Sequence, residues 1–436
     1  MKMPLSVQRD LARWYPLIEH PVQARLIGDP ARFKVAAAGR RSGKTERAKR
    51  HAVKTAMRNP GETLFIAAPT RDQVKRIYWT DIKKLSLAST HRQKPSETEL
   101  RVYFPNSSTI ELVGLDKPAR IEGSLWTGGI VDEISDTKPN AWNENIRPAL
   151  DTYNPERPDY KAWCWLIGVP DGLNHYHDLY DYAATSGDPE WAAYTWKSAD
   201  ILPAETIASA MRSMSARQFR QEYEASFETA SGRIYDDYGP ENHTQSRIEP
   251  HEQLRWMHDQ NYTPLSSAVG VVRGAALYLL DEIILTSAVS RQSAEEFVEK
   301  FKAHENKNVL IYGDPAGRAG EKHGQESAYS AIEEVLRNHG WKFTRKVKPA
   351  HPSIKDRQNQ VRAKICNAKG DRTLFVNPAS APYCHRGLAT VQLKKGSTFL
   401  EEESDVQHVT TAIGYMIDVE WPINPMAMSL KMGVAN

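Results

Sequence analysis

The sequence predicts an α/β protein in which a parallel β-sheet carries helices on both faces. Short, nearly continuous apolar runs alternate with helical stretches, and three such runs cover residues 33–38, 63–68 and 162–169. The first run leads into the turn GRRSGKT, from Gly39 to Thr45, and a helical stretch follows. A strand, a glycine-containing turn ending in Gly-Lys-Thr and a helix are the context of a phosphate-binding P-loop. Because open α/β sheets bind nucleotides at the carboxyl ends of their strands, we expect a nucleotide site there.

Length and composition indicate several globular domains. The chain has 436 residues, enough for about two to three domains with cores of their own. Its net charge is only +3, so a nucleic-acid surface would have to come from local patches. The three cysteines, Cys164, Cys366 and Cys384, form no CxxC pair and predict neither a disulfide framework nor a zinc site, which fits a reducing cytosol. No apolar run is long enough to span a membrane.

The turn after the first strand has the residues that bind a triphosphate. Backbone N–H groups and the helix N-terminus would cradle the phosphates, with Lys44 reaching the β and γ groups. The Thr45 hydroxyl would ligate Mg²⁺. The usual pattern G-x-x-x-x-G-K-[ST] has glycine at position 38, where this chain has Ala38, with glycine one position later. The predicted nucleotide-binding residues of the turn are Gly39, Ser42, Gly43, Lys44 and Thr45.

Three residues outside this turn are further candidates. Asp132 and Glu133 end a small apolar strand, where Asp132 would hold Mg²⁺ and Glu133 would polarise the attacking water as general base. Gln23 precedes the first strand, and its amide could read the adenine edge or simply lie on the surface.

Five segments resemble the large terminase subunit of tailed bacteriophages. They are GRRSGKT, APTRDQVK (68–75), GIVDE (129–133), IRPAL (146–150) and GVP (168–170). The resemblance implies that Lys44, Thr45 and Asp132 bind Mg-ATP, that Glu133 is catalytic, and that Arg40 or Arg41 contacts the γ-phosphate. The segment 168–170 would couple hydrolysis to movement. The family usually has Gly-Thr-Pro there, whereas this chain has valine in place of the threonine.

The resemblance also implies the domain order. A P-loop ATPase domain of the additional-strand type would cover residues 1–200 and a lid or linker 201–244. A nuclease domain with an RNase H-like fold would cover 245–436.

A two-metal nuclease needs carboxylates from separate strands, and three aspartates are candidates. Asp314 ends an apolar strand in a Gly-Asp-Pro turn, and Asp259 matches the first acidic position of the family. The family's His-x-x-Asp-Ala matches residues 408–412, so Thr411 stands where the third aspartate belongs. Either Asp405 or one of residues 401–403 would replace it, or these acids are only solvent-exposed residues that interact favourably with the N-terminus of the following helix. We therefore expect this nuclease site to bind Mg²⁺ or Mn²⁺ more weakly than the sites of its relatives, or to need help from a partner.

A basic stretch between residues 342 and 364 is the candidate DNA phosphate track, although such stretches are often solvated faces. His351, His385 and His408 show no metal-ligand spacing and are expected to be structural. A second basic set follows the P-loop and is expected to lie on a helix surface or in a subunit contact. Its members are Arg47, Lys49, Arg50, Lys54 and Arg58. The predicted DNA-binding residues are Lys342, Arg345, Lys346, Lys348, Lys355 and Arg357.

The family resemblance implies a DNA-packaging motor that hydrolyses ATP, translocates double-stranded DNA into a procapsid and cuts concatemers. Its implied partners are the small terminase subunit and the portal protein, in a homo-oligomeric ring in the host cytoplasm. A helicase-like ATPase is an alternative, but it needs a second RecA-like domain, for which residues 245–436 show no pattern. A second alternative is a weak or degenerate nuclease domain that acts as a DNA clamp or needs a partner nuclease.

Overall fold

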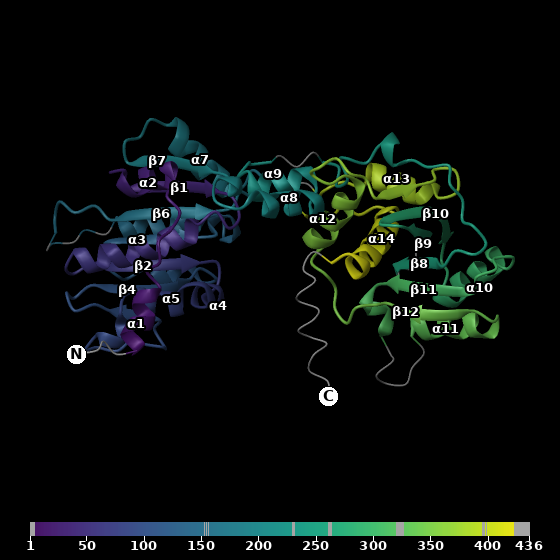
Figure 1. Ribbon diagram of the computed structural model, residues 1–436, viewed down its shortest axis with the longest axis horizontal. Coiled ribbons are helices and arrows are strands. Elements are labelled where there is room, and N and C mark those ends of the chain that lie inside the picture. The colour runs from purple at the N-terminus through teal and green to yellow at the C-terminus, as the bar shows by residue number, and fades with distance from the viewer. Residues whose placement is uncertain are drawn as a thin grey trace. The chain divides into compact units, whose positions relative to one another are not determined.

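The computed structural model describes residues 5–151, 153, 155, 157–228, 232–259, 264–319, 327–394, 397 and 399–422 (Figure 1). Two compact units divide the chain, and each is described by itself. The first contains the described residues up to Ile207 and those from Arg220 to 228, and the second contains the rest. No helix among the described residues has the length and apolarity needed to cross a bilayer.

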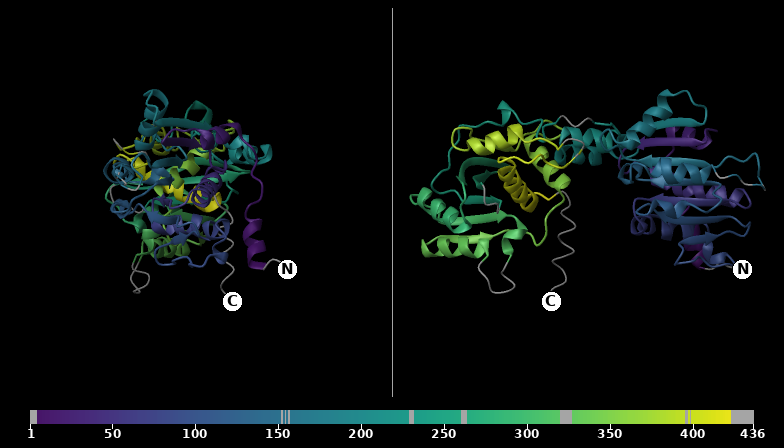
Figure 2. Two further views of the ribbon diagram at one scale, coloured as in Figure 1. Left: turned by 90° about the vertical axis from the view of Figure 1, so that its left-hand side faces the viewer. Right: turned by 180° about the vertical axis from the view of Figure 1, so that it is seen from behind.

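The first unit is built on a seven-stranded sheet (Figures 1 and 2). Neighbouring strands are parallel except at one edge, where a hairpin makes β3 antiparallel to β4. The predicted parallel sheet is confirmed, and β6 is the additional strand between β1 and β5. In spatial order the strands are β3 (Arg101–Tyr103), β4 (Thr109–Gly114), β2 (Thr63–Ala68), β5 (Gly128–Asp132), β6 (Trp163–Gly168), β1 (Phe33–Ala38) and β7 (Trp191–Trp196).

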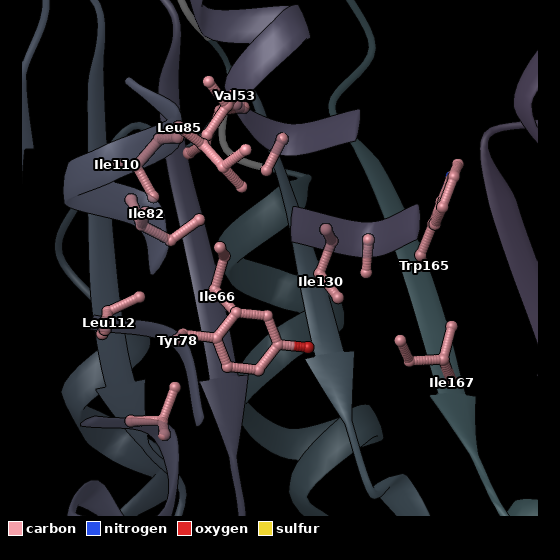
Figure 3. Close-up of a cluster of buried hydrophobic side chains, with 14 of the residues drawn as sticks. Val53, Ile66, Tyr78, Ile82, Leu85, Ile110, Leu112, Ile130, Trp165 and Ile167 are labelled. Carbon is pink, nitrogen blue, oxygen red and sulfur yellow. The ribbon is translucent and has the colours of Figure 1, made fainter. Parts of the chain in front are cut away.

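Helices cover both faces of this sheet, because alternate side chains of the buried strands point to opposite sides. Ala36 and Ala38 of β1 join one apolar cluster, part of which is shown in Figure 3, and Val35 and Ala37 join the other. The first cluster includes α2 (Pro21–Gly28), α3 (Lys44–Arg58) and the continuous run α4 (Arg71–Val74), η1 (Lys75–Trp79, a π-helix) and α5 (Thr80–Leu85). The second includes η3 (Pro118–Ile121), η4 (Ile134–Asp136), η5 (Trp142–Ile146), α6 (Arg147–Leu150) and α7 (His175–Thr185). The remaining helices before residue 230 are α1 (Leu5–Ala12), η2 (Ala88–Thr90), η6 (Ser198–Asp200), α8 (Ala204–Ser213) and α9 (Ala216–Tyr223).

The segment between α1 and α2 is held by side chains of α3, the helix that follows the P-loop. Arg50 donates to the Tyr15 carbonyl at 2.7 Å and Arg47 to the Ile18 carbonyl at 2.5 Å. The predicted second basic set thus contributes contacts within the unit. Arg13 adds a bidentate contact to Asp81 in α5.

The second unit is built on a six-stranded sheet. Strands β8, β9 and β10 form an antiparallel meander, and β11 and β12 extend the sheet parallel to β8. This is the RNase H-like arrangement, and the predicted fold class is confirmed. In spatial order the strands are β12 (Lys342–Arg345), β11 (Asn308–Gly313), β8 (Leu254–Asp259), β9 (Leu265–Arg273), β10 (Ala276–Leu285) and β13 (Leu374–Val376).

Helices cover both faces of this sheet as well. One apolar cluster includes α10 (Ser290–Lys300) and α11 (Ala328–Asn338). The other includes α12 (Ile354–Ile365), α13 (Pro382–Thr390) and α14 (Gln407–Glu420). This unit also contains two short helical turns, η7 (Pro240–Asn242) and η8 (Pro315–Arg318), and the part of α8 and α9 from Ala208 to Phe219.

Candidate functional site

The P-loop turn links β1 to α3 and is braced by side chains from outside it. The Ser42 carbonyl accepts hydrogen bonds from the Gln23 amide at 2.8 Å and the Trp196 indole at 3.0 Å. Gly39 packs so tightly that a Cβ on it would lie 2.4 Å from the Ser198 hydroxyl oxygen. This close approach explains why glycine occupies position 39, whereas Ala38 still fits as the last buried residue of the strand.

Gln23 lies in α2 and is buried. It donates to Ser42, and its amide oxygen accepts from the Arg47 guanidinium at 2.7 Å. Its position therefore makes it a brace of the P-loop, and the predicted contact with adenine stays a prediction.

Asp132 ends β5 and receives three hydrogen bonds. One carboxylate oxygen accepts from the Thr45 hydroxyl at 3.0 Å and the Tyr78 hydroxyl at 2.7 Å. The other accepts from the backbone N–H of Glu133 at 3.0 Å. A hydroxyl and a carboxylate are oxygen ligands of the type that Mg²⁺ takes beside phosphates, so Thr45 and Asp132 fit this ion.

Glu133 faces the P-loop lysine, with 4.0 Å between its carboxylate oxygen and the Lys44 ammonium nitrogen. Its backbone is in the left-handed region, with φ of 51°, an uncommon conformation for a side-chain-bearing residue. Burial raises the pKa of the Glu133 carboxyl, Asp132 and Asp136 act in the same direction, and Lys44 and Arg40 oppose them. A raised pKa suits a carboxylate that accepts a proton from water.

The two arginines of the turn are both exposed. Arg40 makes a 2.7 Å ion pair with Glu222, and Arg41 has a φ of 58°. Both therefore remain candidates for a contact with a phosphate.

The segment predicted to couple hydrolysis to movement begins at Gly168, where β6 ends between β1 and β5. The register pairs Gly168 with Ala37 of β1 and Ile167 with Asp132 of β5. The helix after this segment contacts the turn after Glu133, because the His175 ring lies 2.9 Å from the Ile134 carbonyl oxygen.

Two predicted carboxylates lie side by side in the second unit. The parallel register of β8 and β11 pairs His258 with Gly313, so Asp259 and Asp314 follow at neighbouring positions. From the sequence, Asp259 is expected to lie just before the first strand of the unit, which is expected over residues 266–272. It is instead the last residue of β8, a strand that the sequence does not predict because Arg255 and His258 interrupt its apolar pattern.

Two histidines contact these carboxylates, and a tyrosine contacts one of the histidines. His408 lies 3.0 Å from Asp259, and His351 lies 3.5 Å from Asp314. His351 also lies 3.0 Å from the hydroxyl of Tyr415, whose pKa is raised by burial and then by the charges of Asp314 and Asp259. His351 and His408 therefore lie beside the two carboxylates, and the expectation that they are structural stays a prediction. The two histidines lie 57 positions apart in the chain, on either side of α12, so their spacing shows no metal-ligand pattern.

Two candidates for the third carboxylate form ion pairs with arginines. Asp405 pairs with Arg386 at 2.8 Å, and Glu401 pairs with the buried Arg357 at 3.2 Å. No group of three or more His, Cys, Asp or Glu side chains in the described part of the chain has a geometry that could hold a metal ion. Asp259 and Asp314 fit part of a two-metal site, and Thr411, buried on α14, adds no negative charge.

The predicted DNA track is partly neutralised. Lys346 pairs with Glu420 at 2.8 Å, Lys348 with Asp418 at 2.6 Å and Arg345 with Glu333 at 3.2 Å. Arg357 is 7% exposed, so its assignment to the DNA surface is wrong. Lys342 is exposed and Lys355 half-buried.

Comparisons with known proteins agree with the motifs. No protein-family profile matches the chain. It is 29% identical to the large terminase subunit of Escherichia phage T5 over 192 residues, which are 42% of this chain and 41% of that protein. It is 26% identical to the large terminase subunit of Thermus phage G20c over 249 residues, half of each chain. The matches thus span half or less of these relatives' length.

A solved structure extends the likeness in fold. The large terminase of a thermophilic bacteriophage superimposes with a TM-score of 0.57 at 16% identity, covering 96% of this chain and 99% of that one. The same protein has also been solved in complex with ADP. The chain is therefore similar in sequence to phage large terminase subunits and shares the fold of a solved member of that family.

Proposed function

We propose that the chain is the ATPase of a phage DNA-packaging motor, which hydrolyses ATP to move double-stranded DNA into a procapsid. The observation that carries the proposal is the convergence of Thr45 on Asp132 at 3.0 Å and of Lys44 on Glu133 at 4.0 Å. This geometry supports roles for Lys44 as the phosphate-binding cation, for Thr45 and Asp132 as Mg²⁺ ligands, and for Glu133 as the base. The similarity to phage terminases supports DNA as the substrate that is moved.

In this mechanism the P-loop N–H groups and Lys44 bind the phosphates, and Thr45 and Asp132 hold Mg²⁺. The ion neutralises charge on the phosphate oxygens when it is bound. Glu133 orients the attacking water and accepts its proton, while Arg40 or Arg41 contacts the γ-phosphate. Gln23 would contact adenine, and the segment 168–170 would transmit hydrolysis to the DNA-contacting surfaces.

Substituting Glu133→Gln in the full chain tests this proposal. We expect ATP hydrolysis to fall by at least about a hundredfold, because the base is removed while the side chain keeps its size. Nucleotide binding should persist. Asp178→Asn, which changes a carboxylate that is 80% exposed, is the control. Unchanged hydrolysis in the Glu133 variant would refute the assignment.

The organisation and partners of the family belong to the same proposal. An ATPase domain would cover residues 1–200, a lid or linker 201–244 and a nuclease domain 245–436. The motor would be a homo-oligomeric ring in the host cytoplasm that docks on the portal protein with the small terminase subunit. Lys342, Arg345, Lys346, Lys348 and Lys355 would contact DNA phosphates.

A second candidate activity is metal-dependent endonucleolytic cleavage of concatemeric DNA. It rests on Asp259, the last residue of β8, and Asp314, which follows the adjacent parallel strand β11, because two-metal hydrolysis needs carboxylates that lie close together. Because Thr411 supplies no third carboxylate, the alternative is a weak or degenerate nuclease that clamps DNA or needs a partner nuclease.

Cleavage of supercoiled plasmid by the full chain with Mg²⁺ or Mn²⁺ distinguishes these alternatives. We expect activity that is lost in Asp259→Asn and Asp314→Asn and kept in Asp405→Asn, whose carboxylate pairs with Arg386 instead. DNA binding without cleavage in the unmodified chain would favour the clamp.

A further inference from the structure

The helix that follows β2 contains a π-helical turn beside the nucleotide site. This turn, η1, inserts one extra residue between α4 and α5, which turns the helix by about 100° relative to a continuous α-helix. It places Tyr78 and Trp79 in the buried face of the helix. Such π turns are frequent at functional sites because they aim a side chain that an α-helix would direct elsewhere.

The aimed side chain is Tyr78, which is 0% exposed. Its ring lies in the apolar cluster with Ile66, Leu112 and Ile130, and its hydroxyl oxygen points toward the strand that carries Ile130 (Figure 3). Asp132 is the last residue of that strand and accepts the Tyr78 hydroxyl at 2.7 Å. The Lys49 ammonium lies 5.4 Å from the ring centroid on the α3 side.

The hydroxyl, rather than the ring, is the part that packing alone does not explain. Phenylalanine would fill the same apolar space without a polar atom that has to be satisfied. The hydroxyl instead gives Asp132 a second side-chain donor on the oxygen that Thr45 contacts. The phenol therefore donates and the Asp132 carboxylate accepts.

We propose that Tyr78 is a positioning residue for Mg-nucleotide binding, which fixes the Asp132 carboxylate in the orientation that faces Thr45. The inference rests on the proposed ATPase function. The π turn brings the tyrosine to the carboxylate, and the bond from Tyr78 adds to those from Thr45 and the Glu133 N–H in restricting its rotation. In a protein without this donor, Asp132 would have to be ordered when Mg²⁺ binds, at a cost in affinity.

Tyr78→Phe in the full chain tests the proposal through Mg²⁺. Thermal stabilisation by ADP and ATP hydrolysis are each measured against Mg²⁺ concentration. We expect the half-maximal Mg²⁺ concentration to rise about tenfold in both, the size of one hydrogen bond to a charged group. Saturating Mg²⁺ should restore most of kcat. The matched control is Tyr194→Phe, which removes a tyrosine hydroxyl donating to Asp29 at 2.5 Å in the same unit.

The outcomes separate the two proposals. No Mg²⁺-dependent nucleotide binding or hydrolysis by the unmodified chain refutes the ATPase itself. With an active parent chain, an unchanged Mg²⁺ requirement in Tyr78→Phe overturns the positioning role. An equal loss at every Mg²⁺ concentration, with a lower Tm, also overturns it, because that pattern reports packing alone.

A double-mutant cycle gives a readout that needs no activity. Tyr78→Phe, Asp132→Asn and the double variant are compared by Tm in the absence of nucleotide. A non-additive result supports direct coupling of the two side chains, and additive shifts argue against it.

Discussion

Position 411 decides how much negative charge the second unit can offer a metal ion. Thr411 lies on α14 one turn after His408, which contacts Asp259. A threonine hydroxyl is a neutral ligand, so in the proposed site only Asp259 and Asp314 of the described residues would supply charge. The sequence predicted this deficit, but not the two histidines that stand beside the carboxylates.

Thr411→Asp should strengthen metal binding at this site. A third carboxylate on α14 would raise the affinity for Mn²⁺ by about tenfold or more, while like-charge repulsion lowers the stability of the metal-free unit. Titration calorimetry with Mn²⁺ measures the affinity. Thr411→Asn is the control of similar size without charge, and equal affinities for the two variants would contradict the prediction.

Gln23 offers a second test at a single residue. Removing its amide in Gln23→Ala takes one of two donors from the Ser42 carbonyl and leaves the Trp196 indole. If its main role is to brace the P-loop, the affinities for ATP and GTP should fall by a similar factor, about three- to tenfold. A loss confined to ATP would instead identify Gln23 as the adenine reader. Competition binding with both nucleotides distinguishes these results.

At the scale of the element, the sequence predicted strands well where they were apolar and poorly where polar residues interrupt them. The run 33–38 is confirmed as β1, whereas β8 was not predicted because Arg255 and His258 break its pattern. The π turn that aims Tyr78 could not be predicted either, because the apolar periodicity used to recognise an α-helix does not show where one extra residue is inserted.

Ion pairs between elements that are distant in the chain could not be predicted from the sequence either. The basic stretch 342–364 looked like a uniform DNA track, but α14 supplies Asp418 and Glu420 to two of its lysines. Arg357 is buried because Gly414 has no side chain. A Cβ there would lie 2.5 Å from the Arg357 side chain.

An ion-pair network of the first unit predicts a dependence of stability on pH. It joins Arg13 and Lys49 to Glu46 of α3 and Asp81 of α5. Hydrogen bonds from Arg13 hold the pKa of Asp81 well below its ordinary value. Burial acts to raise the pKa of Glu46, but Arg13 and Lys49 outweigh it and lower it. Because both folded pKa values lie below the unfolded ones, this stabilisation is full above about pH 4.5 and is lost as the pH falls.

We therefore expect the unfolding free energy of the first unit to drop by about 1–2 kcal/mol more than in an Asp81→Asn variant between pH 5 and pH 3. Denaturant titrations followed by tryptophan fluorescence measure both. Identical pH dependence in the two proteins would show that the network is not the source.

At the scale of the whole molecule, the order of the motifs along the chain predicted the nucleotide site better than any single motif did. The imperfect P-loop, the Asp132-Glu133 pair and the Gly168 segment meet at the carboxyl ends of the inner strands β1, β5 and β6, as their order implied. The boundaries of the predicted domains stay predictions.

Two units with separate cores should respond separately to ligands. We expect Mg-ADP to raise the unfolding temperature of the first unit and to leave that of the second unchanged, because a ligand stabilises only what it binds. Calorimetry of the full chain with and without Mg-ADP would show one shifted and one unshifted transition. A common shift of both would mean that the units unfold together.

The hydrogen bonds from α3 to the segment ahead of α2 suggest a position for a fluorescent label. Ile18 is 61% exposed, yet its carbonyl is held by Arg47, which also touches the Gln23 brace of the P-loop. Two of the native cysteines, Cys164 and Cys384, are buried. An environment-sensitive dye on a cysteine introduced at position 18 would therefore sit one side chain away from the P-loop brace and turn nucleotide exchange into a fluorescence signal.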